Sequence, residues 1–143
     1  MTTIAYRDGV LAADTQVSRC GNDSGRTVKV RRIGGLLVGA CGTTSLTQRF
    51  IGWIAGGMKG PAPPLRIDDS HACVVAVMPD GALVEWNGDH PPDITRARFA
   101  AWGSGADIAL GAMAFGASAE QAVKAAASID HATGGDITAL SVR

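Results

Sequence analysis

The feature that most constrains the fold of this chain is a succession of short strands joined by tight turns. Residues 2–6 and 10–13 have the pattern of strands on either side of Asp8-Gly9, the dipeptide that a two-residue hairpin turn prefers. Residues 28–32 alternate with period two and lead through a glycine pair into an apolar strand at 36–40. Short turns of this kind join antiparallel strands, because a parallel crossover needs a dozen or more residues. The first forty residues therefore predict antiparallel sheet.

The middle of the chain predicts one helix and a further hairpin. Apolar residues at helical spacing indicate a helix at 45–55, capped by Ser45 or a nearby threonine. Residues 58–70 contain three prolines and are expected to form a loop. Strands are predicted at 71–78 and 82–86, on either side of a Pro-Asp-Gly turn.

The last third of the chain is mainly helical. A short strand at 99–102 precedes an alanine-rich helix at 106–115, and a Ser-x-x-Gln capping box begins a second helix over 118–131. A final strand is predicted at 136–142. A polar, glycine-bearing stretch at 18–27 follows the first hairpin.

Strands, one helix, strands, two helices and a last strand indicate an α+β fold with antiparallel sheets and segregated helices. A chain of 143 residues is long enough for one domain with its own core, so we expect a single domain over residues 1–143.

Composition excludes several classes of function. With 13 basic and 13 acidic residues the net charge is zero, whereas nucleic-acid-binding proteins usually carry a basic excess. No apolar run approaches a membrane span, and no apolar leader precedes the first strand. The cysteines are three, widely spaced and in no CxxC pair, which is typical of reduced thiols in a cytoplasmic protein (Cys20, Cys41 and Cys73). We expect no metal, cofactor, nucleic-acid or membrane partner.

The second residue has the groups of a nucleophile and its base. Initiator methionine is normally removed before a residue as small as threonine, which would leave Thr2 with a free α-amine beside its hydroxyl. An α-amine, with a reference pKa of about 7.7–8.0, can serve as the base that a hydroxyl nucleophile needs. Lys29 and Asp14 are candidates for a supporting cation and its carboxylate partner. Taken alone, the same residues also fit an ordinary strand residue and a surface ion pair, and composition favours that interpretation.

Five segments in chain order change this balance. They are TTIAYRDGVLAADTQ, VKVRRI, LLVGACGTT, AAWGSGADIALGAM and SIDHATGGDITALSV. Together they resemble the proteasome β-type peptidases, and especially the bacterial HslV-type peptidases, over nearly the whole chain. The resemblance implies the N-terminal nucleophile hydrolase fold, a four-layer αββα sandwich of two antiparallel sheets.

The resemblance also implies a catalytic mechanism. Thr2 Oγ would attack a peptide carbonyl while the Thr2 α-amine accepts its proton. Lys29, oriented by Asp14, would lower the pKa of that amine, and the Gly42 amide would bind the oxyanion. Three further residues would hold the amine in place: Ser104, Asp130 and Thr133.

Two positions match residues that line the substrate pocket of that family, Ser18 and Ala40. The small Ala40 suggests a roomy, uncharged pocket and cleavage after apolar residues. As a whole, the resemblance implies a threonine endopeptidase that cleaves unfolded polypeptides in a homo-oligomeric ring, served by an ATP-dependent unfoldase.

Two features of the sequence bear on this interpretation. The family usually has two substantial helices where this chain has one short helix and a proline loop, so we expect a reduced helix layer. If Met1 is retained, the Thr2 nitrogen is a peptide amide and cannot act as a base. The alternatives are therefore a catalytically silent assembly or structural protein with the same fold and, third, a small-amide hydrolase.

Other motifs fit simpler explanations. Gly103-Ser-Gly105 lacks the third glycine and the βαβ context of a nucleotide site. The run 68–71, Asp-Asp-Ser-His, is typical of a polar loop before a strand. Cys41 has apolar neighbours and no partner histidine in its motif.

Overall fold

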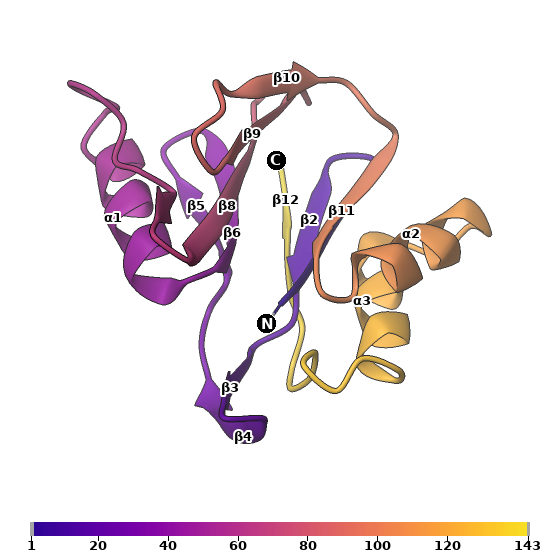
Figure 1. Ribbon diagram of the computed structural model, residues 1–143. Coiled ribbons are helices and arrows are strands. Elements are labelled where there is room, and N and C mark those ends of the chain that lie inside the picture. The colour runs from indigo at the N-terminus through magenta and orange to yellow at the C-terminus, as the bar shows by residue number, and fades with distance from the viewer. Residues whose placement is uncertain (1, 143) are drawn as a thin grey trace.

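Two antiparallel sheets face each other in the computed structural model, which describes residues 2–142 (Figure 1). The first sheet has the strand order β11-β1-β2-β12 and the second the order β10-β9-β8-β6-β5, with β7 paired to β8. The first sheet consists of β1 (Thr3–Arg7), β2 (Val10–Ala13), β11 (Phe99–Gly103) and β12 (Thr138–Ser141). The second consists of β5 (Val30–Ile33), β6 (Leu36–Gly42), β7 (Arg66–Ile67), β8 (Ser70–Val77), β9 (Leu83–Asn87) and β10 (Asp93–Thr95).

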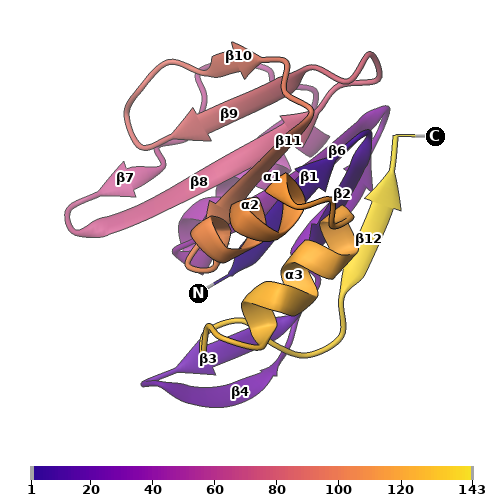
Figure 2. The same ribbon diagram turned by 90° about the vertical axis from the view of Figure 1, so that its right-hand side faces the viewer.

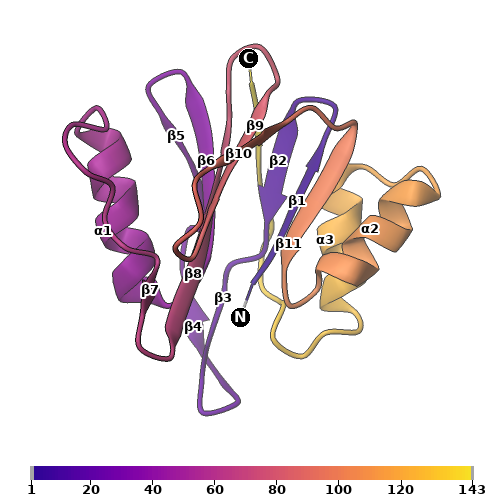
Figure 3. The same cartoon turned by 45° about the horizontal axis from the view of Figure 1, so that its top comes forward.

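Helices cover the outer faces of both sheets, which makes four layers (Figure 3). Helix α1 (Thr44–Ala55) packs on β6 and β8 of the second sheet. Helices α2 (Ala106–Ala114) and α3 (Ala119–Ala127) pack on the first sheet, side by side (Figure 2). The predicted αββα sandwich is confirmed, and so is its reduced helix layer, because α1 alone lies on the outer face of the second sheet within residues 2–142.

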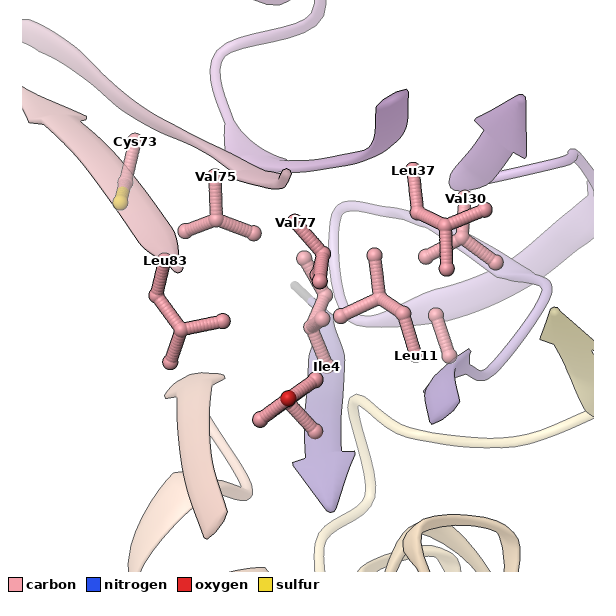
Figure 4. Packing of buried hydrophobic residues seen from close by; sticks show 10 residues of the cluster. Ile4, Leu11, Val30, Leu37, Cys73, Val75, Val77 and Leu83 are labelled. Atoms are coloured by element: carbon pink, nitrogen blue, oxygen red, sulfur yellow. The ribbon is translucent and has the colours of Figure 1, made fainter. Parts of the chain in front are cut away.

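The main core lies between the sheets (Figure 4). Ile4 and Leu11 of the first sheet meet Leu37, Val75 and Val77 of the second, and all five are almost fully buried. Burying each such side chain contributes about 1.5–3 kcal/mol. This contact sets the two sheets face to face.

The first sheet is buried on both faces, which follows from strand alternation. Ile4 belongs to the core between the sheets, whereas its neighbour Ala5 belongs to the cluster under α2 and α3. That outer cluster consists largely of alanines, and small side chains let the helices approach the sheet closely. The alanine-rich helices of the sequence therefore have a packing reason.

The polar stretch 18–27 forms strands that the sequence pattern did not predict. It contributes to a separate hairpin of β3 (Gln16–Arg19) and β4 (Asn22–Arg26), which extends beyond both sheets in Figure 1. Cys20 and Gly21 both have positive φ, at 50° and 79°, as a two-residue hairpin turn of this hand requires. These strands were not predicted because they are largely exposed and carry no alternating apolar pattern.

Helix α3 ends at Ala127, earlier than the predicted end at residue 131. The Ser128 hydroxyl donates to the Ala125 carbonyl at 2.7 Å, and Asp130 Oδ1 accepts the amide of Ala132 at 3.0 Å. Such local side-chain bonds compete with helical hydrogen bonding. As a result Asp130 lies in a turn, where its carboxylate can reach other elements.

No helix within residues 2–142 is long and apolar enough to cross a membrane.

Candidate active site

Thr2 lies immediately before β1. It is buried, with 7% of its surface exposed, yet it lines two neighbouring cavities. Its carbonyl accepts a hydrogen bond from the Ser104 amide at 2.8 Å. A Cβ atom at Gly103 would overlap that carbonyl, so the glycine before Ser104 is needed for the close approach of the two segments.

Lys29 and Asp14 form a buried ion pair one residue outside β5 and β2. Lys29 Nζ lies 3.0 Å from both carboxylate oxygens of Asp14, whose side chain is fully buried. Asp14 also accepts the amides of Thr3 and Gly134, each at 3.1 Å. The interpretation of this pair as a surface ion pair is therefore wrong, because the fold removes it from solvent.

Burial lowers the pKa of the Lys29 ammonium below its usual value, and the facing Asp14 carboxylate offsets only part of this effect. Lys29 lines the same cavity as Thr2 and Gly42. A buried cation in this cavity can stabilise negative charge that develops at Thr2.

Gly42 ends β6 beside this cavity. Its φ of 103° lies in the region that favours glycine, and a Cβ atom there would come within 2.7 Å of the Ala72 Cα. Its backbone thus has a conformation that other residues rarely adopt. Gly42 lines both cavities beside Thr2.

A hydroxyl network connects the loop after α3 with the start of β1 and the end of β11. Asp130 Oδ2 accepts hydrogen bonds from Ser104 Oγ at 2.5 Å and from Thr133 Oγ1 at 2.7 Å. Because the Thr133 hydroxyl already donates its hydrogen bond to Asp130, it can only accept from Thr3. Thr3 Oγ1 therefore donates to Thr133 Oγ1, at 2.6 Å. Burial alone would raise the pKa of Asp130, but these donors outweigh it and hold the pKa below its usual value. The carboxylate stays ionised and fixes the loop.

The first cavity has a volume of about 200 Å³, and both predicted pocket residues, Ser18 and Ala40, line it beside Thr2. Its wall also includes Lys29 and Arg31. The expectation of an uncharged pocket is therefore wrong, because Lys29, just before β5, and Arg31, within β5, place two cations in the wall of this cavity.

The other six predicted catalytic residues lie around Thr2 or are hydrogen-bonded to residues next to it. Sequence reasoning missed Thr3, whose amide and hydroxyl join the ion pair to the hydroxyl network, and Gly134, which donates to Asp14. It also missed the reason for Gly105, where a Cβ atom would overlap the Thr3 hydroxyl. The spacing of two glycines around a serine was the available signal.

The motifs set aside earlier have structural places that do not call for a metal or a nucleotide. Residues 68–71 span the turn after β7 and the first two residues of β8, and among residues 2–142 no three His, Cys, Asp or Glu side chains are grouped to hold a metal ion. Gly103 and Gly105 serve the contact with Thr2 and Thr3 rather than a phosphate. Cys41 faces Cys73 across β6 and β8 and lines both cavities.

The four layers, the strand order and the buried entry of the first strand define the fold of the N-terminal nucleophile hydrolases of the HslV type. No protein-family model matches the sequence, and no curated protein matches it significantly.

Solved structures similar to this chain include those of BPH and HslV. BPH from Thiobacillus denitrificans aligns with a TM-score of 0.72 and 21% identity, and its complex with epoxomicin with 0.71 and 20%; both alignments cover 99% of this chain and 98% of the other. HslV from Trypanosoma brucei aligns with a TM-score of 0.66 and 19% identity over 98% of each chain. At these identities the comparison establishes the fold.

Proposed function

We propose that this chain is a threonine peptidase in which Thr2, freed of Met1, is both nucleophile and base. The observation that carries the proposal is the common cavity of Thr2, Lys29 and Gly42, with Lys29 held by the buried Asp14. Met1 lies outside the described residues, so the state of the Thr2 amine is part of the proposal.

The proposed reaction is acyl transfer through an ester. Thr2 Oγ attacks the peptide carbonyl carbon while its proton passes to the Thr2 α-amine. The Gly42 amide donates to the oxyanion, a contact that typically lowers a barrier by about 2.7–4 kcal/mol. As the intermediate collapses, the C–N bond breaks and the ammonium returns the proton to the leaving amine. Water then hydrolyses the ester and restores the Thr2 hydroxyl.

The positive charge of Lys29 would lower the pKa of the nearby amine and so keep it unprotonated near neutral pH. Ser104, Asp130 and Thr133 would hold the backbone around that amine, since Ser104 and Thr3 are tied to Thr2 on either side. These roles match those implied by the resemblance.

We further propose that the subunits form a homo-oligomeric ring in the cytoplasm, fed by an ATP-dependent unfoldase. A nucleophile that lines two cavities has no device of its own to reject folded proteins. Enclosure in a ring, with unfolding by a partner, would provide that selection for polypeptide substrates.

Two measurements test the peptidase. Intact mass of the protein purified from its natural host should show the loss of Met1. A peptide epoxyketone such as epoxomicin, which BPH binds in one of the similar structures, requires a free amine beside the hydroxyl. It should add to the wild-type chain and to Thr2→Ser but not to Thr2→Ala.

Thr2→Ser is the matched control because it keeps the hydroxyl and still permits removal of Met1. Labelling of Thr2→Ala would show that the nucleophile is a residue other than Thr2. Full retention of Met1 would contradict the peptidase function and favour a catalytically silent structural protein.

A further inference from the structure

The second cavity beside Thr2 has a polar wall that the proposed chemistry does not use. It has a volume of about 330 Å³ and shares Thr2, Cys41 and Gly42 with the first cavity. The rest of its wall comes from β8, β9 and the end of β11, including Glu85, Asn87 and Trp102. Thr2 therefore lines both cavities, together with Cys41 and Gly42.

Glu85 is unusual for its place in the sheet. Residues 83, 85 and 87 point to one face of β9 by strand alternation, and Leu83 on that face belongs to the core between the sheets. A carboxylate on a core-facing side costs desolvation unless it is hydrogen-bonded. Glu85 also lines the same cavity as the candidate nucleophile Thr2, so its charge is expected to have a function.

The neighbours of Glu85 satisfy its oxygens with neutral donors. Oε2 accepts Trp102 Nε1 at 2.9 Å, which links the two sheets, and Oε1 accepts Asn87 Nδ2 at 3.4 Å and Cys73 Sγ at 3.7 Å. No basic side chain among residues 2–142 lies within ion-pair distance of it. A neutral glutamine could accept the Trp102 hydrogen bond equally well, so that bond does not explain the charge.

A carboxylate offers about four acceptor positions, and three are occupied here. Glu85 lines a cavity of about 330 Å³, which is large enough for a long side chain to enter. A lysine or arginine side chain there would gain a charge-assisted hydrogen bond in a partly dehydrated site.

We propose that the second cavity binds the residue on the leaving-amine side of the scissile bond and that Glu85 selects a basic side chain there. This rests on the proposed peptidase function. A peptide with its acyl half in the first cavity and its carbonyl at Thr2 must continue past Thr2, and the second cavity receives that part of the chain. Glu85 acts in specificity and takes no part in bond breaking.

The test is a competition between peptides with the same acyl half and either lysine or norleucine after the scissile bond. Norleucine has the length of lysine without its ammonium group. The ratio of kcat/KM for lysine over norleucine should be about tenfold in the wild type, a size expected of one charge-assisted hydrogen bond in a half-exposed site. In Glu85→Gln it should fall to about one.

Glu120→Gln is the matched control, because it makes the same charge change on the exposed side of α3 and should keep the wild-type ratio. In the wild type the ratio should also fall between about 0.05 and 1 M salt, since salt screens a half-exposed ion pair. This measurement tests the proposal even if Glu85→Gln does not fold.

A wild-type ratio near one, or a ratio unchanged in folded Glu85→Gln, overturns the role of Glu85. If the epoxyketone still labels Thr2 in that case, the peptidase stands and only this inference fails. If a chain freed of Met1 is neither labelled nor active on either peptide, the proposed function fails and the inference fails with it.

Discussion

At the scale of single residues, Gly42 is the position where one added carbon has the largest expected effect. Gly42→Ala places a Cβ atom against the backbone of β8 and forces alanine to a φ of 103°. Backbone strain of this kind costs about 1–3 kcal/mol, and the overlap adds to it. We expect lower stability in urea unfolding and loss of epoxyketone labelling.

Gly52→Ala is the control for that substitution. Gly52 lies in the exposed interior of α1, with ordinary φ and open space around its Cβ position. Alanine there should raise stability by about 0.5–1 kcal/mol and leave labelling intact. Equal effects of the two substitutions would contradict the assigned geometry.

The Lys29–Asp14 pair predicts strong coupling between two residues. Removing one partner of a buried ion pair typically costs about 3–5 kcal/mol, because it leaves an uncompensated charge. Lys29→Met and Asp14→Asn should each destabilise the protein strongly, whereas the double variant should lose clearly less than the sum. Urea unfolding of the four proteins measures this, and additive losses would argue against a buried pair.

Asp130 predicts a pH dependence of stability. Its pKa is lowered in the folded state, so its contribution is complete above the unfolded value near 3.8 and is lost as the pH falls through the folded pKa. Asp130→Asn should therefore be less stable than wild type at pH 7, with the difference shrinking in strong acid. Thermal unfolding at a series of pH values measures this difference in stability. A difference that stays constant from pH 7 into strong acid would contradict the lowered pKa.

At the scale of elements, the helix starts differ in how they are capped. Ser118 and Gln121 form a reciprocal capping box at α3, whereas Thr43 occupies the N-cap position of α1 without a side-chain hydrogen bond. Ser118→Ala should therefore cost about 1 kcal/mol, and Thr43→Ala much less. Thermal unfolding of the two variants distinguishes the helices, and the reverse order would show that the caps are misassigned.

The elements also show where sequence patterns suffice. The capping box, the Asp-Gly turn and the β-branched apolar run of β8 are local signals, and each predicted its element. Hairpin β3–β4 has no apolar face, so the pattern that marks strands was missing there. The end of α3 depends on hydroxyl and carboxylate bonds that compete with the helix.

At the scale of the whole molecule, the proposed ring makes a direct prediction. Light scattering of the purified protein should give a mass several times that of the 14.6 kDa chain. Because α1 alone covers the outer face of the second sheet, that face offers less helical surface for contacts between subunits than two helices would. A clean monomer at working concentration would contradict the ring while leaving the chemistry of Thr2 to the labelling test.

By itself the sequence determined the order and kind of most elements and, from these, the α+β class, because turn dipeptides, caps and apolar periodicity act over a few neighbouring residues. The four-layer αββα sandwich and the site residues were predicted only through resemblance. Asp14, Lys29 and Asp130 are far apart in the chain, and packing of one sheet on the other brings them around Thr2. The tertiary structure alone decided that the ion pair is buried and that Glu85 faces a second cavity, because burial depends on elements that no local pattern describes.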